Sequence, residues 1–174
     1  MIKTVLLGNP NPKYTYGFNT SFGYKQFDLS LDFQGIAGVD IYNANLALRF
    51  GTENFTEDVY NNRWHGSGTS NTYPSVYFAG GQNPRSNSFY VEDGSYFRVR
   101  NAQIGYTLSS GLTNKWKISR LRIYANAQNP LNFFKYRGFS PEVLAKDNNP
   151  TRAGVDVDVY PIYATYNFGV NLSF

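Results

Sequence analysis

The stretch YATYNFGVNLSF, from Tyr163 to Phe174, decides the fold class of this chain. Apolar and aromatic residues occupy one parity of the stretch: Ala164, Tyr166, Phe168, Val170, Leu172 and Phe174. The other parity carries only small uncharged polar residues and glycine: Thr165, Asn167, Gly169, Asn171 and Ser173. A strict period of two indicates a β-strand with one apolar and one polar face. An uncharged polar face suits a water-filled lumen and favours a membrane barrel, although a strand of a soluble β-sandwich alternates in the same way.

The composition of the chain points to an all-β fold. Its 174 residues have the length of one ordinary domain, and they include 15 Tyr, 14 Phe, 16 Gly and 8 Pro, which favour strands and turns. With a mean hydropathy of −0.44, no apolar run approaches the about 20 residues that a membrane-spanning helix needs. This excludes a helical membrane protein but not a barrel, whose strands are apolar only at every second position. The net charge of +4 is mild and spread along the sequence, so no basic cluster predicts nucleic-acid binding.

Two alternating runs near the start of the chain predict a β-hairpin. The first run spans residues 14–24 and the second residues 27–34, and only Lys25 and Gln26 separate them. Each run is about ten residues long, which is the length that a tilted strand needs to cross a bilayer. Two such runs joined by about two residues read as a hairpin, even without the preferred Asn-Gly turn.

Two further strands follow in the second half of the chain. One begins at Tyr96 and runs to Leu108, and its parity changes between Val99 and Ala102. We interpret this change as a β-bulge, or as a part of the strand above the membrane where parity is unconstrained. The next strand begins at Leu121, and we expect Pro130 to end its regular pairing because proline has no backbone donor.

The connections between these five strands alternate in length: short, long, short and long. Such an order is typical of outer-membrane barrels, which have short periplasmic turns and long outer loops, and it predicts a periplasmic C-terminus. Five strands cannot close a membrane barrel, and an open sheet would leave unpaired edges in lipid. We therefore expect the strands to belong to a larger barrel. Residues 1–7 are also too short for a signal peptide, so we expect this chain to be the C-terminal piece of an exported protein.

The two long connections, about residues 35–95 and 131–162, carry little regular pattern apart from a weak helical patch around residues 44–50. The first is rich in aromatic residues, among them Trp64, Tyr73 and Tyr77. Such rings can stack on the apolar face of a sugar, but packing of the loop itself is the simpler explanation.

Catalytic and metal-binding patterns are weak in this sequence. The only histidine, His65, has no acidic or cysteine partner at metal spacing, and the chain has no cysteine. The aspartates Asp147, Asp156 and Asp158 lack the later ligands of a calcium loop. Asp28 and Asp32 lie on one strand face about 13 Å apart, which is too far for a glycosidase pair. We predict no enzyme, no metal and no cofactor, and we read these two aspartates as polar residues that face the lumen.

Five collinear stretches resemble the C-terminal end of the SusC/RagA-like TonB-dependent outer-membrane transporters of Bacteroidetes. They are GNPNPKYTYGFNTSFGYKQFDLSLDFQG (residues 8–35), NRW (62–64), VEDGSYFRVRNAQIGYTL (91–108), LRIYANAQNPLNFFKYRGFSPEV (121–143) and the closing YNFGVNLSF. The resemblance implies the last five strands of a barrel of 22, and the uptake of a large nutrient such as a glycan or an oligopeptide. It also implies a SusD-like surface lipoprotein as a lid, and energy from the TonB complex through an N-terminal plug.

The resemblance also assigns roles to individual residues. By similarity to other barrels, the barrel-assembly machinery recognises the apolar parity of the final strand: Tyr166, Phe168, Val170, Leu172 and Phe174. The loop aromatics Trp64, Tyr73 and Tyr77 are candidates for contacts with the substrate or the lid. The plug, TonB box and N-terminal domain of the family have no counterpart in residues 1–174, so the whole chain is expected to be the C-terminal portion of the barrel. The alternative function is that of a secreted β-sandwich module that binds carbohydrate.

Overall fold

The computed structural model describes residues 6–49, 56–76, 86–143 and 149–174. The chain forms two compact units. One unit comprises residues 14–37, 96–134 and 162–174, and the other comprises the remaining described residues. Within the described ranges, no helix has both the length and the apolar character needed to cross a membrane.

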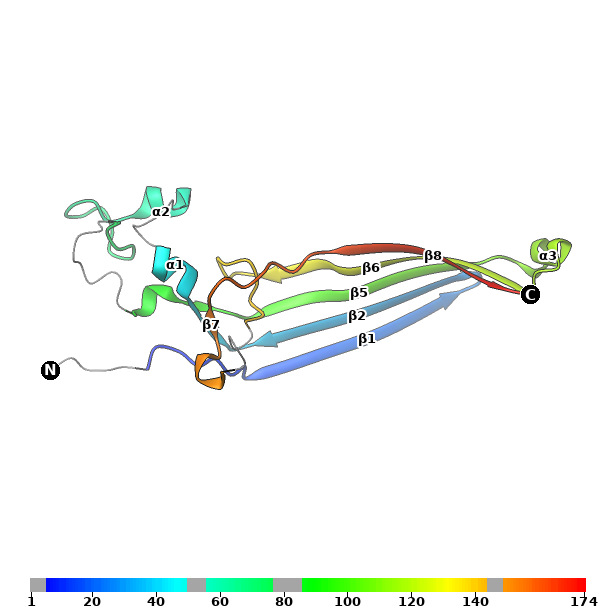
Figure 1. The fold of residues 1–174 in the computed structure, drawn as a ribbon, viewed down its shortest axis with the longest axis horizontal. Coiled ribbons are helices and arrows are strands. Elements are labelled where there is room, and N and C mark those ends of the chain that lie inside the picture. The colour runs from blue at the N-terminus through cyan, green and yellow to red at the C-terminus, as the bar shows by residue number, and fades with distance from the viewer. Residues whose placement is uncertain (1–5, 50–55, 77–85, 144–148) are drawn as a thin grey trace. The chain divides into compact units, whose positions relative to one another are not determined.

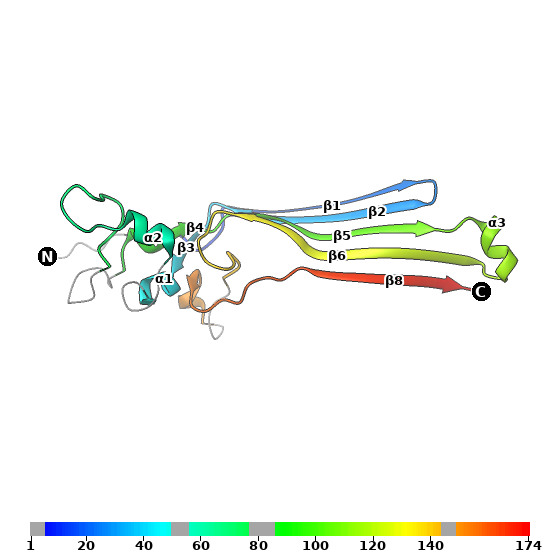
Figure 2. The same cartoon turned by 90° about the horizontal axis from the view of Figure 1, so that it is seen from above.

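The first unit, the sheet unit, is a five-stranded antiparallel sheet with the order β1-β2-β5-β6-β8. Its strands lie side by side in Figures 1 and 2. Their bounds are β1 Tyr14–Tyr24, β2 Phe27–Ala37, β5 Tyr96–Thr107, β6 Arg120–Phe134 and β8 Thr165–Ser173. Each strand pairs with the next in this order, so the five predicted strands are confirmed. The long strands follow from the alternating pattern, since a half-buried sheet needs one apolar residue in every two.

The two short connections lie at the same edge of the sheet, where the strands end and not along an outer strand. In the β1–β2 hairpin Lys25 takes a left-handed conformation with φ of 53°, which makes the tight turn without glycine. Between β5 and β6 the chain forms the helical turns α3 (Ser110–Thr113) and η2 (Asn114–Trp116). The predicted hairpin at Lys25-Gln26 and the short second connection are therefore confirmed.

A β-bulge explains the parity change on β5. The register of β5 is continuous from Asn101 onward and from Val99 backward, and it skips Arg100 between them. The bulge interpretation is therefore confirmed. The expectation for Pro130 is wrong, because β6 continues past it to Phe134. Pro130 lies in the register shift of β6 beside Asn129, whose φ is 49°, and a missing donor is tolerated at such an irregularity.

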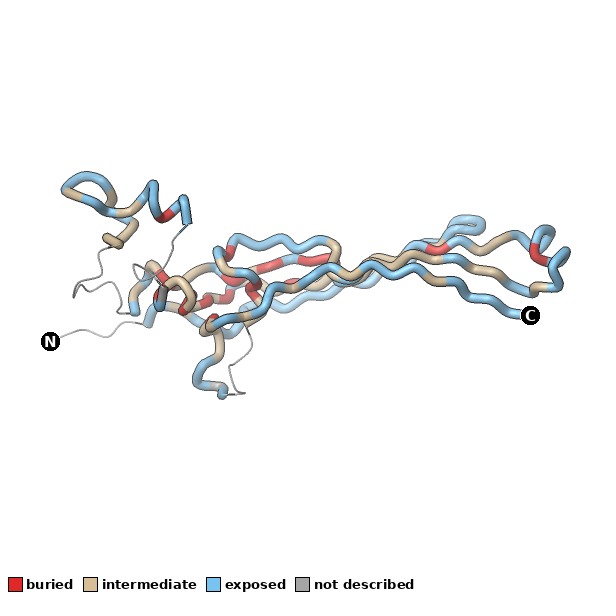
Figure 3. Tube along the Cα trace, turned by 45° about the horizontal axis from the view of Figure 1, so that its top comes forward, coloured by how far each residue is buried: buried red, intermediate tan, exposed pale blue. Residues whose placement is uncertain are grey.

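The second unit, the loop unit, is built from residues 6–13 and from both long connections. It contains β3 (Asp40–Asn43), α1 (Ala44–Arg49), α2 (Glu57–Asn62), η1 (Ser88–Tyr90), β4 (Val91–Asp93), η4 (Pro150–Arg152) and β7 (Val155–Asp156). The helical patch around residues 44–50 is confirmed by α1. The hydrophobic core of the loop unit includes Ile41, Val59 and Tyr90, each almost fully buried. Figure 3 shows in red where the buried parts of the chain lie.

A small sheet joins the two long connections. Its order is β4-β3-β7, with β3 antiparallel to β4 and parallel to β7. Strands β3 and β4 come from the first connection and β7 comes from the second. The sequence did not predict this sheet, because strands of two to four residues are too short to show a period.

Candidate functional site: the sheet wall and the joined loops

The polar side chains of the five strands share one face of the sheet. The register pairs Ser30 with Ser21 and with Gln103, and it continues from Gln103 to Asn126 and from Asn126 to Asn167. Residues that pair directly project to the same side, so a polar row crosses all five strands. The Nδ2 atom of Asn126 donates to Oδ1 of Asn101 at 2.6 Å on this face. The polar residues that were predicted separately for each strand thus form one continuous surface.

An ion pair on this face spans an intervening strand. Arg122 on β6 donates from Nε to Oδ1 of Asp28 on β2 at 2.9 Å, and from Nη2 to Oδ2 at 2.5 Å. Strand β5 lies between these two strands, with Gly105 beneath the ion pair. A Cβ atom added at Gly105 would collide with the side chains of both Arg122 and Asp28. The missing side chain at Gly105 therefore makes room for the pair. Asp28 is paired with the guanidinium of Arg122, which agrees with its prediction as a polar residue of the sheet and not a catalytic one.

A second glycine allows the same network to reach the last strand. Tyr124 on β6 pairs with Gly169 on β8, and any Cβ at Gly169 would overlap the tyrosine ring. The guanidinium carbon of Arg122 lies 5.2 Å from the centroid of the Tyr124 ring. The side chains of Asp28, Arg122 and Tyr124 thus cover parts of β2, β5, β6 and β8 in one connected group.

The opposite face of the sheet unit is apolar and rich in aromatic rings. Phe33 stacks on Phe18 with a centroid distance of 6.0 Å and on Phe97 with a distance of 5.8 Å. Phe97 continues the row to Phe133 at 6.3 Å, so rings from four neighbouring strands follow one another. A β-sandwich would bury such a face against a second sheet. Here Phe33 is half-buried and Phe97 is 38% exposed, while Phe18, Phe133 and the apolar residues of β8 are more exposed.

The apolar residues of the final strand all lie on this exposed face. Their exposed fractions run from 46% at Leu172 to 88% at Phe174, with Tyr166, Phe168 and Val170 between these values. β8 pairs through one edge with β6, from Gln128 opposite Thr165 to Arg120 opposite Ser173. The five residues proposed as an assembly signal therefore form one uninterrupted apolar row.

In the loop unit, Asp156 is a buried hub that ties the second long connection to the first. The hydroxyl of Tyr136 donates to Oδ2 of Asp156 at 2.5 Å, and Nδ2 of Asn45 donates to Oδ1 at 3.0 Å. Burial, together with this hydrogen bond, raises the pKa of the Tyr136 hydroxyl well above its usual range. Asp156 therefore has structural partners, and among the described residues no three His, Cys, Asp or Glu side chains lie close enough to hold a metal ion.

Glu92 makes a second link between the two connections. Its Oε1 accepts from Nδ2 of Asn43 at 2.9 Å and lies 3.1 Å from Nη2 of Arg137. Its Oε2 accepts from the backbone nitrogen of Arg137 at 2.9 Å. Because Asn43 and Glu92 belong to the first connection and Arg137 to the second, the two long connections are joined by side chains as well as by the β3–β7 pair.

The structure places two of the three predicted loop aromatics. Trp64 follows α2 and leaves 45% of its surface exposed. Tyr73 donates from its hydroxyl to Oδ2 of Asp58 at 2.7 Å, and its ring contacts Phe89 edge to face at 5.2 Å. Tyr77 lies outside the described residues. Tyr73 therefore helps to hold the loop together, as packing would require, while Trp64 presents more of its ring to solvent.

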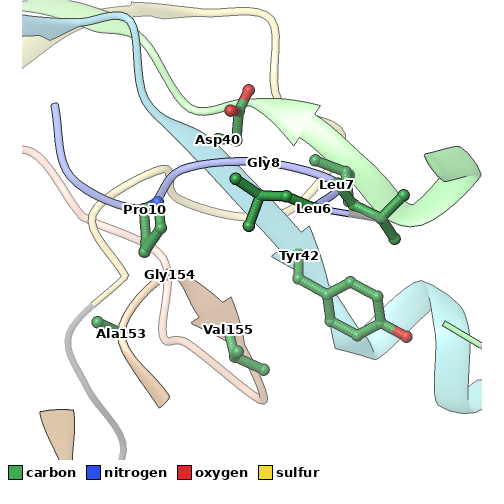
Figure 4. A pocket seen from close by; sticks show the side chains of 10 residues that line it. Leu6, Leu7, Gly8, Pro10, Asp40, Tyr42, Ala153, Gly154 and Val155 are labelled. Carbon is green, nitrogen blue, oxygen red and sulfur yellow. The ribbon is translucent and has the colours of Figure 1, made fainter. Parts of the chain in front are cut away.

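A pocket of about 430 Å³ lies in the loop unit beside β3 and β7 (Figure 4). Its walls are mostly apolar and include Leu6, Pro10, Tyr42 and Val155. One side is the segment around residues 6–10, which Asn9 fixes by donating from its backbone nitrogen to Oδ2 of Asp40 at 2.8 Å. Sequence analysis missed this pocket, since its walls come from four separate parts of the chain.

Comparisons with known proteins agree with the membrane-barrel interpretation. No family model matches the sequence. The chain is 35% identical to TonB-dependent receptor P3 of Formosa agariphila over 97% of this chain and 17% of that protein. It is 27% identical to TonB-dependent receptor SusC of Bacteroides thetaiotaomicron, over 91% of this chain and 15% of that protein.

Solved structures give the same result for the fold. The RagAB peptide importer in its closed-closed state superposes with a TM-score of 0.74 and 27% identity, over 98% of this chain and 18% of that one. In its open-open state it superposes with a TM-score of 0.71, also at 27% identity, over 94% and 17%. The chain thus spans less than a fifth of the length of each of these relatives.

The two-faced antiparallel sheet and these likenesses define a segment of a large membrane β-barrel. Over nearly its whole length, the chain is similar to part of the SusC/RagA-like TonB-dependent receptors. The β-sandwich alternative is therefore wrong.

Proposed function

We propose that this chain forms part of the wall and two of the outer loops of an outer-membrane active transporter for large nutrients. The observation that carries the proposal is the division of one sheet into a continuous polar face and an exposed apolar face. In a barrel the apolar face contacts lipid and the polar face lines the lumen. The relatives support transport and not catalysis, since they are named as receptors and as a peptide importer.

The proposal includes an orientation for the chain. The short connections at Lys25 and at Ser110–Trp116 face the periplasm, together with the C-terminus at Phe174. The joined long connections of the loop unit face outward. This arrangement follows the usual division of loop lengths in outer-membrane barrels. Residues 1–174 then correspond to the C-terminal portion of the barrel.

The proposed partners follow from the family. A SusD-like lipoprotein covers the outer mouth, and the loop unit contributes to the surface on which it rests. The name RagAB, a peptide importer, supports a two-component system for that relative. The TonB complex acts through a plug elsewhere in the protein, and the barrel-assembly machinery recognises the apolar row of β8. Substrates are glycans or oligopeptides, with Trp64, Tyr73 and Tyr77 as candidates for loop contacts.

Uptake by cells tests this function directly. The full-length protein that carries this segment is expressed in a host lacking its own copy, with and without the neighbouring lipoprotein. Uptake of labelled oligopeptides and oligosaccharides of matched size is then measured. The proposal predicts uptake of one class that stops when TonB is deleted or the proton gradient is collapsed. Uptake that continues unchanged without TonB, or a protein absent from the outer-membrane fraction, would contradict it.

A further inference from the structure

The edge of the sheet that holds the short connections is strongly basic. Lys25 lies in the β1–β2 turn, and Lys115 and Lys117 lie in the connection from β5 to β6. Arg120 is the first residue of β6 and shares the polar face with Arg122. All four side chains are exposed. The backbone nitrogen of Thr107 donates to the carbonyl of Gln26 at 2.8 Å, so the two connections are neighbours at this edge. This corrects the sequence-based statement that the basic residues are spread evenly.

These four residues account for the whole net charge of the chain. The sequence has 16 basic and 12 acidic residues, so the remaining basic residues balance the acidic ones. Neither residues 24–27 nor residues 107–120 include an aspartate or glutamate. Asp28 follows the turn directly but is bound by Arg122. The edge stays positive when the carboxylate of Phe174 is counted against it.

Exposed apolar side chains accompany this charge. Leu112 and Trp116 of the α3–η2 connection are 51% and 61% exposed, while Thr113 between them is buried. Tyr24 is also exposed at the β1–β2 turn, and Nζ of Lys25 lies 5.4 Å from the centroid of its ring. The apolar face of β8 reaches the same edge at Phe174, and Ser119 donates from its backbone nitrogen to the carbonyl of Ser173 at 2.9 Å.

Trp, Tyr and Lys side chains combine in this way at the boundary between a bilayer and water. Their apolar parts lie among the upper acyl chains, and their charged ends reach the headgroups. The apolar face of the sheet, which is proposed to contact lipid, reaches this edge at Phe174. The headgroups beside the edge therefore belong to the leaflet on the side of the short connections. A cluster of basic residues in that position attracts anionic lipids.

We propose that this basic edge, formed by Lys25, Lys115 and Lys117 with Trp116 and Leu112, binds anionic phospholipid headgroups. The binding holds the barrel at a fixed depth in the periplasmic leaflet of the outer membrane. The inference rests on the proposed function for its membrane setting and orientation. It adds a lipid partner for an edge of the sheet that the transport reaction itself does not use.

Lipid binding by the full-length transporter tests the inference. The protein is placed in nanodiscs of phosphatidylcholine mixed with phosphatidylglycerol, extracted with mild detergent, and analysed for the lipids that it retains. The test variant combines Lys25→Gln, Lys115→Gln and Lys117→Gln. The control combines Lys13→Gln, Lys135→Gln and Arg152→Gln, which removes the same charge from exposed positions of the loop unit.

The wild type and the control are expected to retain phosphatidylglycerol in preference to phosphatidylcholine. The test variant should lose this preference at least about fivefold, because each basic residue near a membrane surface contributes about that factor. Equal retention by the test variant and the wild type would overturn the inference. Stronger retention of lipid A than of phosphatidylglycerol in a parallel nanodisc would also overturn it, because lipid A belongs to the outer leaflet. Circular dichroism and heat-modifiable migration check that each variant is folded.

The two proposals fail in different ways. A protein that retains phosphatidylglycerol through the basic edge but takes up no nutrient would contradict the transport function alone. A protein that transports normally, with no lipid preference in either variant, would contradict only the inference about the basic edge.

Discussion

Arg122 of β6 and Asp28 of β2 form an ion pair across strand β5, which lies between them. The Nη2 to Oδ2 distance is 2.5 Å, and the guanidinium passes over Gly105 of β5. The pair lies on the polar face of the sheet, which a barrel turns toward its lumen. It links β2 to β6 directly, and Tyr124 extends the link to Gly169 of β8.

Filling the space at Gly105 should weaken the folded barrel. We predict that Gly105→Val in the full-length protein destabilises it by about 1 to 3 kcal/mol, since overpacking forces neighbouring side chains to move. The matched control is Gly23→Val, because Gly23 lies on the same face and a Cβ at that position would have no neighbouring atom within 4 Å. Urea unfolding followed by tryptophan fluorescence measures both. Equal destabilisation of the two variants would show that the ion pair does not need the glycine.

Phe174 should be needed for assembly of the barrel into the outer membrane. We predict that Phe174→Ser lowers the level of the full-length protein in the outer membrane severalfold, because it removes the end of the apolar row of β8. Ser173→Ala serves as the control on the opposite parity. Quantitative blotting of outer-membrane fractions and heat-modifiable gel migration provide the measurement. Unchanged levels for Phe174→Ser would refute the role of this residue as an assembly signal.

The buried hydroxyl of Tyr136 should hold in place Asp156, which joins the second long connection to the first through Asn45. We predict that Tyr136→Phe destabilises the loop unit by about 1 to 3 kcal/mol, since Asp156 loses a buried hydrogen-bond donor. Hydrogen exchange of β3 and β7 measures local opening, and Tyr160→Phe is the control because Tyr160 is 80% exposed. If exchange in β3 and β7 is as slow in Tyr136→Phe as in the control, the hydrogen bond contributes nothing.

The same residue predicts a dependence on alkaline pH. The pKa of Tyr136 is raised in the folded loop unit above its ordinary value of 10.0. A raised pKa means that the stabilisation is fully present below about pH 10 and is lost as the pH rises beyond it. Burial raises the pKa of Tyr90 in the same direction, so part of the dependence should survive in Tyr136→Phe. Proteolysis of the loop unit between about pH 8 and 11 tests this, and an identical pH profile for the wild type and Tyr136→Phe would refute it.

Of the two candidate loop aromatics that the structure describes, Trp64 is more exposed than Tyr73 and so better placed to touch a ligand or a lid. We predict that Trp64→Ala weakens binding of the lipoprotein or of the transported nutrient by about tenfold or more, as expected for an exposed aromatic anchor. Tyr73→Phe should instead destabilise the loop, because Tyr73 donates to Asp58. Isothermal titration with the purified full-length protein separates the two effects. Full affinity in Trp64→Ala for both partners would exclude Trp64 from either surface.

The sheet could be predicted from sequence because its strands carry long repeating patterns. Alternation over many residues indicated β1, β2, β5, β6 and β8, and a change of parity located the bulge near Arg100. Pro130 was misjudged, because its effect depends on whether the register shifts there, and register is a property of two strands. The loop unit was not predicted, since its β3–β7 pair joins segments more than a hundred residues apart. The basic edge was missed for the same reason, as its residues gather only when the hairpin and the α3–η2 connection become neighbours.

The most direct test of the account is the environment of alternate residues on β8. The 174 residues contain no cysteine, so single cysteines introduced at Asn167, Phe168, Val170 and Asn171 are the only ones in this segment. Any cysteine elsewhere in the full-length protein is replaced by serine before spin-labelling in bilayers. The account predicts that labels at residues 168 and 170 collide mainly with oxygen, which concentrates in lipid. Labels at residues 167 and 171 should collide mainly with a water-soluble nickel chelate. Equal accessibility at all four positions, or the reverse alternation, would contradict a sheet with one face in lipid and the other in a lumen.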